Sequence, residues 1–244
     1  MNDYNIIMIY EKEKMPPSGS NETNSYTLTV GLLEVQGAFL EHRVALQKAA
    51  QLLGNVDLRL MEIRTANHVT DELDGLVIPG GESTTISIYL KRNEMEEPLR
   101  RWIHNDRHVT WGTCAGMILL SKMTDNQKIG GQSTLAIMET EVSRNYFGRQ
   151  VHSFESHIHL KEKELKDTIK NETYPGIFIR APAIVKTLSP EVKILATLQK
   201  SDSEVIVAAQ QGHVISTAFH PELTEDCSWH MYFLKTIIDI KKSK

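Results

Sequence analysis

Cysteines and long apolar runs are both scarce in this sequence of 244 residues. The two cysteines, Cys114 and Cys227, lie far apart and form neither a CxxC pair nor a disulfide framework. No apolar run approaches the roughly 20 residues of a membrane-spanning helix, and the run at residues 6–9 is too short for the apolar core of a signal peptide. The sequence therefore predicts a cytoplasmic protein with no membrane contact.

An excess of positive charge is also absent. The 27 Lys and Arg residues are mixed with 31 Asp and Glu residues, for a net charge of -4, whereas a nucleic-acid-binding face needs clustered basic side chains. The segment at residues 79–83, Pro-Gly-Gly-Glu-Ser, lacks the Gly-Lys-Ser/Thr ending of a P-loop and the GxGxxG pattern of a dinucleotide site. Nucleic acids and nucleotides are therefore not expected as partners.

The first 25 residues differ in composition from the rest of the chain. Residues 11–25 combine charged residues, a Pro-Pro pair and small polar residues, a composition that favours a solvated segment. A periodic apolar pattern begins at Tyr26. We therefore expect residues 1–25 to be a flexible N-terminal extension and residues 26–244 to form a single domain.

From residue 26 onward, short apolar strands alternate with helical patterns. Strands are expected at residues 28–33, 57–63, 76–78 and 109–111, and helices at residues 39–53 and after residues 83 and 116. Later strands are expected at residues 135–142, 153–160, 176–179, 205–209 and 214–219, followed by a helix over residues 226–240. This order predicts a three-layer α/β fold, with a mainly parallel central sheet flanked by helices and with sites at the carboxyl ends of its strands.

The strongest candidate for chemistry is Cys114, in the segment Gly-Thr-Cys-Ala-Gly at residues 112–116. A nucleophile on a sharp strand-to-helix turn needs small neighbours, and glycines flank this cysteine on both sides. The N-terminus of the following helix would stabilise a thiolate and offer the Ala115 N–H to an oxyanion. A lone cysteine is more often a buried structural residue, but the flanking glycines favour the nucleophile.

Two further segments could complete a catalytic site. In Phe-His-Pro-Glu at residues 219–222, His220 follows a strand and can act as a base, while Glu222 can orient its imidazole. The Gly-Gly turn at residues 80–81 can aim a peptide N–H at an oxyanion from the side opposite Ala115. Each segment alone could be an ordinary turn or surface residue, and their combination with the cysteine turn makes a Cys-His-Glu triad the preferred hypothesis.

Together these motifs resemble the class I, or triad, glutamine amidotransferases. Several segments narrow the resemblance, over residues 27–238, to the glutaminase subunits of pyridoxal 5'-phosphate synthases. They are Val-Gln-Gly-Ala-Phe at 35–39, Pro-Gly-Gly-Glu-Ser-Thr at 79–84, Arg-Asn-Tyr-Phe-Gly-Arg-Gln at 144–150, Phe-Ile-Arg-Ala-Pro at 178–182 and Phe-His-Pro-Glu-Leu-Thr-Glu-Asp at 219–226. The resemblance implies a flavodoxin-like, class I glutamine amidotransferase fold.

The resemblance also implies roles for individual residues. Cys114 would attack the carboxamide of L-glutamine, His220 would transfer protons, and Glu222 would hold His220. The glutamine pocket would be formed by Gly81, Glu82, Ser83, Arg144, Ile179 and Arg180, and the oxyanion hole by the amides of Gly81 and Ala115. The sequence leaves open whether the two arginines bind through side chain or backbone. No metal or organic cofactor is implied.

Ammonia released into bulk water would be protonated and lost, so such a glutaminase implies a partner. By resemblance, the partner is a barrel-shaped synthase subunit that makes pyridoxal 5'-phosphate (vitamin B6) in a hetero-oligomer. By the same resemblance, members of the family are typically inactive as glutaminases until they dock with the synthase subunit. The Gln36-Gly37 and Gly80-Gly81 segments are candidates for rearrangement on docking.

Other interpretations stay open at the level of sequence. The chain could supply ammonia to another biosynthetic pathway, or it could be a catalytically silent regulatory subunit that keeps the fold. His152, His157 and His159 alternate along an expected strand, which favours a half-exposed polar face over a metal site. Cys227, at the start of the last expected helix, is interpreted as structural.

Overall fold

The computed structural model describes residues 25–125, 133–148, 153–201 and 203–243. The predicted extension over residues 1–25 therefore lies outside the described residues, apart from its last residue. The first half contains β1 (Tyr26–Leu33), α1 (Phe39–Leu53), β2 (Val56–Ile63), a 3-10 helix (Ala66–His68), β3 (Gly75–Ile78), α2 (Ser83–Arg92), α3 (Glu96–Ile103), β4 (Val109–Thr113) and α4 (Ala115–Leu120). The second half contains β5 (Ser121–Thr124), β6 (Met138–Ser143), β7 (Ser153–Leu160), α5 (Lys163–Ile169), β8 (Thr173–Ile179), β9 (Ala183–Thr187), β10 (Lys193–Lys200), β11 (Ser203–Gln211), β12 (Val214–Thr217), a 3-10 helix (Pro221–Leu223) and α6 (Ser228–Lys242).

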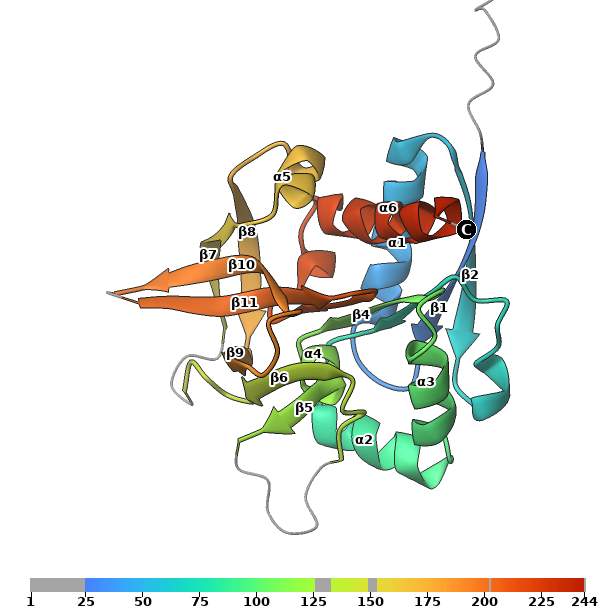
Figure 1. Ribbon diagram of the computed structural model, residues 1–244, viewed down its shortest axis with the longest axis horizontal. Coiled ribbons are helices and arrows are strands. Elements are labelled where there is room, and N and C mark those ends of the chain that lie inside the picture. Colours follow the sequence, from blue (N-terminus) through green and yellow to red (C-terminus); the bar gives the residue numbers. More distant parts are fainter. Residues whose placement is uncertain (1–24, 126–132, 149–152, 202, 244) are drawn as a thin grey trace, which may run out of the picture.

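The strands form a sheet in the order β2-β1-β3-β4-β12-β11-β10-β7-β8. The first five strands in this order are parallel, and the strands from β12 to β8 pair antiparallel. Helices α1, α5 and α6 lie on one side of the sheet, and α2, α3 and α4 lie on the other (Figure 1). The three-layer α/β fold predicted from the sequence is confirmed, with β5, β6 and β9 joined to it beside β11.

The central strands are buried because helices cover both of their faces. Every residue of β3 and of β4 is buried, as expected for parallel strands between two helical layers. The α1 helix has the bounds predicted from its apolar spacing and ends at Gly54, whose φ of 72° provides the left-handed cap. Trp111 on β4 and Trp229 and Phe233 on α6 are among the largest fully buried side chains, and Trp111 packs against Phe233, so part of the core lies between α6 and the central strands.

Most predicted strands differ by a few residues at their ends, and two of them extend beyond the strands of the structure. The strand expected over residues 214–219 ends at Thr217, because its parallel neighbour β4 ends at Thr113 and the chain then crosses to β8, where His220 N–H donates to Ile177 O (2.8 Å). The strand expected from residue 135 begins at Met138. The preceding residues are bound to the end of α4 instead, where Leu135 N–H donates to Leu119 O (2.6 Å).

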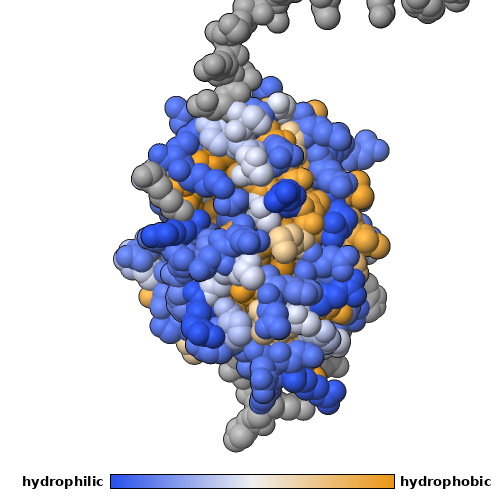
Figure 2. Space-filling view, turned by 90° about the vertical axis from the view of Figure 1, so that its right-hand side faces the viewer, coloured by the Kyte–Doolittle hydropathy of each residue, from blue (hydrophilic) through white to orange (hydrophobic). Residues whose placement is uncertain are grey.

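The outer edge of the parallel half of the sheet is β2. Its residues from Val56 to Leu60 alternate between half-buried and exposed positions, whereas Ile63 at its end is buried. The surface on this side of the molecule is largely hydrophilic, with apolar residues showing between the polar ones (Figure 2). Charged side chains on an edge strand discourage pairing with another chain. Among the described residues, no helix is both long enough and apolar enough to cross a membrane.

Candidate active site

The parallel strands β3, β4 and β12 end at one edge of the sheet. Ile78 pairs with Gly112, and Thr113 pairs with Thr217. The segments that follow these three strands therefore lie close together at this edge. They contain the Gly80-Gly81 turn, Cys114 and His220. The sequence predicted this convergence from the rule that carboxyl ends of neighbouring parallel strands share an edge.

Cys114 occupies a tight turn between β4 and α4. Its φ of 46° and ψ of −98° are rare for a residue with a side chain, and its N–H donates to Thr217 O (2.7 Å). A Cβ on Gly116 would lie 2.1 Å from Ile78 O, and one on Gly112 would lie 2.6 Å from the Gly116 backbone. The two glycines are therefore needed for the close packing that holds Cys114 in this strained conformation.

The buried imidazole of His220 lies between Cys114 and Glu222. Its Nδ1 is 2.7 Å from Glu222 Oε1, and its side chain also interacts with the Cys114 thiol. Gly80 packs against both residues, since a Cβ there would lie 2.4 Å from His220 Cε1 and 3.3 Å from Cys114 Cβ. The sulfur, the imidazole and the carboxylate thus meet at one rim, in the order that a nucleophile, a base and its orienting acid require.

The electrostatics of this cluster favour a charged His220. Burial acts to lower the pKa of His220, but the neighbouring Cys114 and Glu222 outweigh it and raise this pKa to about 10. Burial acts to raise the pKa of Glu222, but the facing imidazole of His42 and the hydrogen-bonded, positively charged imidazole of His220 outweigh it, so that the net shift is downward. The imidazolium and carboxylate forms therefore stabilise each other in an enclosed setting.

A cavity of about 630 Å³ opens in front of Cys114 and His220. It is lined by Gln36, Gly81, Glu82, Ser83, Cys114, Ile118, Asp125, Arg144, Asn145, Ile179, Arg180 and His220. All six residues predicted to form a glutamine pocket lie in this lining. Ala115 and Glu222 do not, because the first begins α4 and the second lies behind the imidazole.

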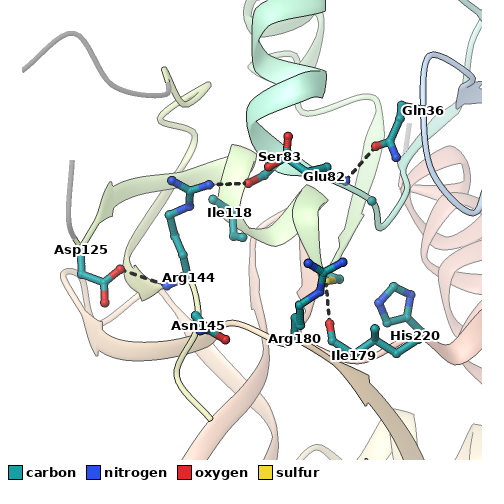
Figure 3. A pocket seen from close by; sticks show the side chains of 12 residues that line it. Gln36, Glu82, Ser83, Ile118, Asp125, Arg144, Asn145, Ile179, Arg180 and His220 are labelled. Atoms are coloured by element: carbon teal, nitrogen blue, oxygen red, sulfur yellow. Dashed lines mark hydrogen bonds between the residues drawn. The ribbon is translucent and has the colours of Figure 1, made fainter. Parts of the chain in front are cut away.

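Arg144 extends its side chain across the cavity toward the start of α2 (Figure 3). Its Nη2 donates to Ser83 Oγ (3.1 Å) and Thr84 Oγ1 (3.0 Å). The backbone N–H of Arg144 donates to Asp125 Oδ1 (3.0 Å), which fixes the segment after β6. Two hydroxyl groups thus hold the guanidinium of Arg144 in the cavity wall, and a guanidinium is the side-chain group best suited to bind a carboxylate.

The carboxylate of Glu82 is turned toward α2. It accepts hydrogen bonds from Thr84 N (3.1 Å), Thr85 N (2.7 Å) and Thr85 Oγ1 (2.7 Å), and so caps the helix. Partial burial acts to raise the pKa of Glu82, but these hydrogen bonds from Thr85 and Thr84 make the net shift downward. Glu82 thus combines a place in the cavity wall with a structural role that the sequence did not indicate.

On the opposite wall, Arg180 is exposed and its backbone has a φ of 42°. The preceding carbonyl, Ile179 O, lies 3.9 Å from Cys114 Sγ, at the limit of a thiol hydrogen bond. A backbone carbonyl of this segment therefore lies beside the sulfur, while Arg180 also lines the cavity. The two arginines consequently differ, because Arg144 reaches the cavity through an anchored side chain.

The Gly80-Gly81 turn is held from behind by the loop that follows β1. Gly80 O accepts from Ala38 N–H (3.0 Å), and Gln36 Oε1 accepts from Glu82 N–H (2.8 Å). Gly37 has a φ of 103°, and a Cβ on it would lie 1.8 Å from Gly80 O. The Gly80 C=O and the Gly81 N–H belong to the same trans peptide and point in opposite directions. Because this C=O points at Ala38, the Gly81 N–H points away from Ala38.

Several residues of the site were not predicted from the sequence. Ile118, Asp125 and Asn145 line the cavity, and His42 lies behind the triad, with Nε2 3.3 Å from Glu222 Oε2. Asn145 belongs to a segment that the sequence singled out for its resemblance, whereas nothing local distinguishes His42 from other helical residues.

The other candidates lie away from this site. His157 and His159 are exposed on β7, and His152 lies outside the described residues. The part of the chain that the structure describes holds no group of three or more His, Cys, Asp or Glu side chains arranged for a metal ion. Cys227 is buried beside the start of α6, a position suited to a structural cysteine.

The raised pKa of His220 predicts a pH-dependent contribution to folding stability. Below the ordinary pKa of 6.5, both the folded and the unfolded chain hold the proton, and the contribution is fully present. As the pH rises from 6.5 to about 10, the unfolded chain loses the proton first and the contribution declines.

We expect the difference in unfolding free energy between the wild type and His220→Gln to shrink over this pH interval. Urea unfolding at pH 6, 8 and 10 measures it. A difference that stays constant or grows with pH would contradict the prediction.

Comparisons with known proteins agree with this geometry. The model of the SNO glutamine amidotransferase family matches residues 32–239. A probable pyridoxal 5'-phosphate synthase subunit PDX2 of Arabidopsis thaliana is 37% identical, over 88% of each chain. A pyridoxal 5'-phosphate synthase subunit PdxT of Thermococcus onnurineus is 39% identical, over 85% of this chain and 98% of its own.

A solved structure described as a glutamine amidotransferase superimposes with a TM-score of 0.71 at 37% identity, covering 85% of this chain and 98% of its own. A putative GMP synthase subunit of Thermoplasma acidophilum, at 15% identity and a TM-score of 0.55, shares the fold. The match of the family model over most of the chain, the relatives at this level of identity and the cysteine turn at the edge of the parallel strands lead to one assignment: the chain belongs to the SNO glutamine amidotransferase family.

Proposed function

We propose that this chain is the glutaminase subunit of a pyridoxal 5'-phosphate synthase. It hydrolyses L-glutamine to L-glutamate and ammonia with Cys114, His220 and Glu222, and it delivers the ammonia to a barrel-type synthase subunit. The observation that carries the proposal is the strained Cys114 beside a buried imidazole–carboxylate pair, at the wall of a polar cavity. The printed names of the PdxT and PDX2 relatives supply the pathway.

In the first half of the reaction, the Cys114 sulfur attacks the carboxamide carbon of glutamine. The negative charge that develops on the carboxamide oxygen is stabilised by the N–H groups of Ala115 and Gly81. Ala115 suits this role because it is the first residue of α4, where backbone N–H groups have no acceptor within the helix. His220 gives its proton to the departing nitrogen, so ammonia leaves and a γ-glutamyl thioester remains.

In the second half, water attacks the thioester. His220, now neutral, takes a proton from the water as the new C–O bond forms. The C–S bond then breaks, which releases glutamate and returns the thiolate paired with the imidazolium. Glu222 stabilises the charged imidazole at both stages through its 2.7 Å contact with Nδ1.

Arg144 is proposed to bind the α-carboxylate of glutamine through its side chain. We expect Arg144→Gln to raise the KM for glutamine by about 10- to 100-fold, the loss of one charge-assisted hydrogen-bonding group, with a smaller change in kcat. Steady-state glutamate release measures both constants. Arg59→Gln is the matched control, because Arg59 is exposed on the edge strand β2 and does not line the cavity. An equal rise in KM for both variants would contradict the assignment.

A partner surface adjoins the triad. A groove of about 400 Å³ is lined by α1 residues and by the chain around Glu222 and Thr224. At its rim Leu40 and Val44, one helical turn apart, are 60% and 65% exposed, and apolar side chains exposed together suit a protein interface. We assign this surface to the synthase subunit. The proposed compartment is the cytosol, as the two unpaired cysteines suggest.

One assay separates this proposal from its alternatives. Glutamine labelled with 15N in the carboxamide is supplied to the chain, alone and together with the synthase subunit and its sugar phosphate substrates. We expect glutamate release to increase when the synthase is added and the label to enter pyridoxal 5'-phosphate. No glutamate above background with the partner present would favour a silent regulatory subunit. Glutamate release without labelled pyridoxal 5'-phosphate would favour another pathway.

A further inference from the structure

A line of buried polar side chains continues behind the triad, away from the cavity. His42, on α1, is fully buried, and its Nδ1 lies 3.0 Å from Nε2 of His230 on α6. Its Nε2 lies 3.1 Å from Thr113 Oγ1 and 3.3 Å from Glu222 Oε2. The triad carboxylate is therefore approached from both sides, by His220 at Oε1 and by His42 at Oε2.

The protonation of this line follows from its burial. Burial lowers the pKa of His42 more than the nearby Glu222 raises it, and burial lowers the pKa of His230 further. Both imidazoles are therefore neutral at physiological pH, and each has one donor nitrogen and one acceptor nitrogen. Trp111 packs edge-on against both rings, at 5.5 and 4.9 Å between centroids, so the rings are confined.

The unpartnered atoms determine which nitrogen of each ring carries the proton. Within the described part of the chain, His230 Nδ1 is buried without a hydrogen-bond partner. A buried lone pair without a donor is tolerated better than a buried N–H without an acceptor. The proton of His230 therefore lies on Nε2, where it is donated to His42 Nδ1. His42 must then carry its own proton on Nε2, which faces Thr113 and Glu222.

Glu222 Oε2 needs such a donor. It is buried, and it makes no hydrogen bond with any residue that the structure describes. An ionised oxygen in this position is costly unless a donor or a positive charge faces it. His42 Nε2 faces this oxygen at 3.3 Å, and its N–H gives a favourable electrostatic contact there, outside hydrogen-bonding geometry.

We propose that His42 is a positioning residue of the glutaminase reaction, whose Nε2–H, fixed by His230, faces the second oxygen of Glu222 and keeps the first directed at His220. This inference rests on the proposed glutaminase function. His42 does not line the cavity, so it acts on the chemical step through Glu222 and leaves glutamine binding unchanged.

The test measures kcat and KM for glutamine in the complex with the synthase subunit. We expect His42→Leu to lower kcat by about 10- to 100-fold, the range for loss of an outer hydrogen-bond partner in metal sites, with KM unchanged. His42→Gln keeps an N–H near the Nε2 position and should recover most of the lost kcat. His108→Leu is the matched control, since His108 is equally enclosed but stacks on Trp102 at the opposite end of β4.

The outcomes separate the two proposals. If the wild type hydrolyses glutamine and His42→Leu retains the wild-type kcat, or if His42→Gln is no better than His42→Leu, the positioning role is wrong. If His42→Leu does not fold, His230→Leu replaces it. That change removes the donor that fixes the His42 proton, and a kcat equal to that of the wild type would again overturn the role. A wild type without glutaminase activity would instead overturn the proposed function.

Discussion

Replacing Cys114 with alanine is expected to lower glutamine hydrolysis by at least about 10⁴-fold, because removal of the nucleophile of a triad leaves only binding and oxyanion stabilisation. The methyl group fits the space of the thiol, and the neighbouring glycines keep the turn intact. The cavity and the partner surface should therefore survive. Glutamate release in the complex with the synthase subunit measures the loss.

The same variant should still support the synthase when ammonium ions are supplied in solution. Ammonia from that source does not depend on the thiol, so pyridoxal 5'-phosphate should form from ammonium salts and not from glutamine. Cys227→Ala is the control for loss of a buried, unpaired thiol, because Cys227 lines the partner groove beside α6 and not the cavity. Retention of glutaminase activity in Cys114→Ala would reject Cys114 as the nucleophile.

Labelling provides an independent measurement. An electrophile built on the glutamine skeleton should modify Cys114 and spare Cys227, because only Cys114 borders the cavity that Arg144 also lines. Mass spectrometry of the digested protein identifies the modified residue. Equal modification of both cysteines would show that the reagent reports thiol access rather than a glutamine site.

The parallel half of the fold could be predicted because its signals are local. A parallel strand covered on both faces is apolar along its whole length, as β3 and β4 are. The glycine-rich segments that follow such strands mark the edge at which they end. Once the strands were assigned, the meeting of Cys114, His220 and the Gly80-Gly81 turn followed from topology alone.

The antiparallel half was harder to predict. The sequence did not indicate α5, β9 or β10. Most of the strands that it did indicate there begin or end at other residues in the structure. Their burial depends on which strand lies alongside. For example, β10 lies between β7 and β11 and contains register shifts at Ala196, and such irregularities are set by the partner strand rather than by local spacing.

The limits of sequence are clearest for the residues that support the triad. His42 and His230 are separated by 188 positions in the chain and meet only because α1 and α6 pack side by side. A buried histidine on a helix has no local pattern that distinguishes a hydrogen-bonded relay from an ordinary core residue. The two arginines likewise look equivalent in sequence, and only the anchoring of Arg144 by Ser83 and Asp125 separates them.

Gly80→Ala should reduce glutaminase activity by about 100-fold or more without unfolding the protein, because displacement of a catalytic group by about 1 Å is enough for a loss of this size. The added Cβ would lie 2.4 Å from His220 Cε1 and 2.9 Å from His220 Nδ1. The ring cannot simply yield, since Glu222 holds its Nδ1 at 2.7 Å. The imidazole must therefore shift relative to Cys114, or the Gly80-Gly81 turn must move with the Gly81 N–H.

Gly212→Ala separates this effect from a general loss of stability. Gly212 has a φ of 57°, and a Cβ on it would meet no atom within 4 Å, so alanine there adds only the cost of a left-handed backbone, about 1 kcal/mol. Activity of the complex with the synthase subunit and thermal unfolding are measured for both variants. Gly80 is buried against the triad, whereas Gly212 lies in the turn before β12. Activity should therefore fall only in Gly80→Ala, even if the two variants unfold at the same temperature. Full activity in Gly80→Ala would mean that the close contact between the turn and the imidazole is not needed for catalysis.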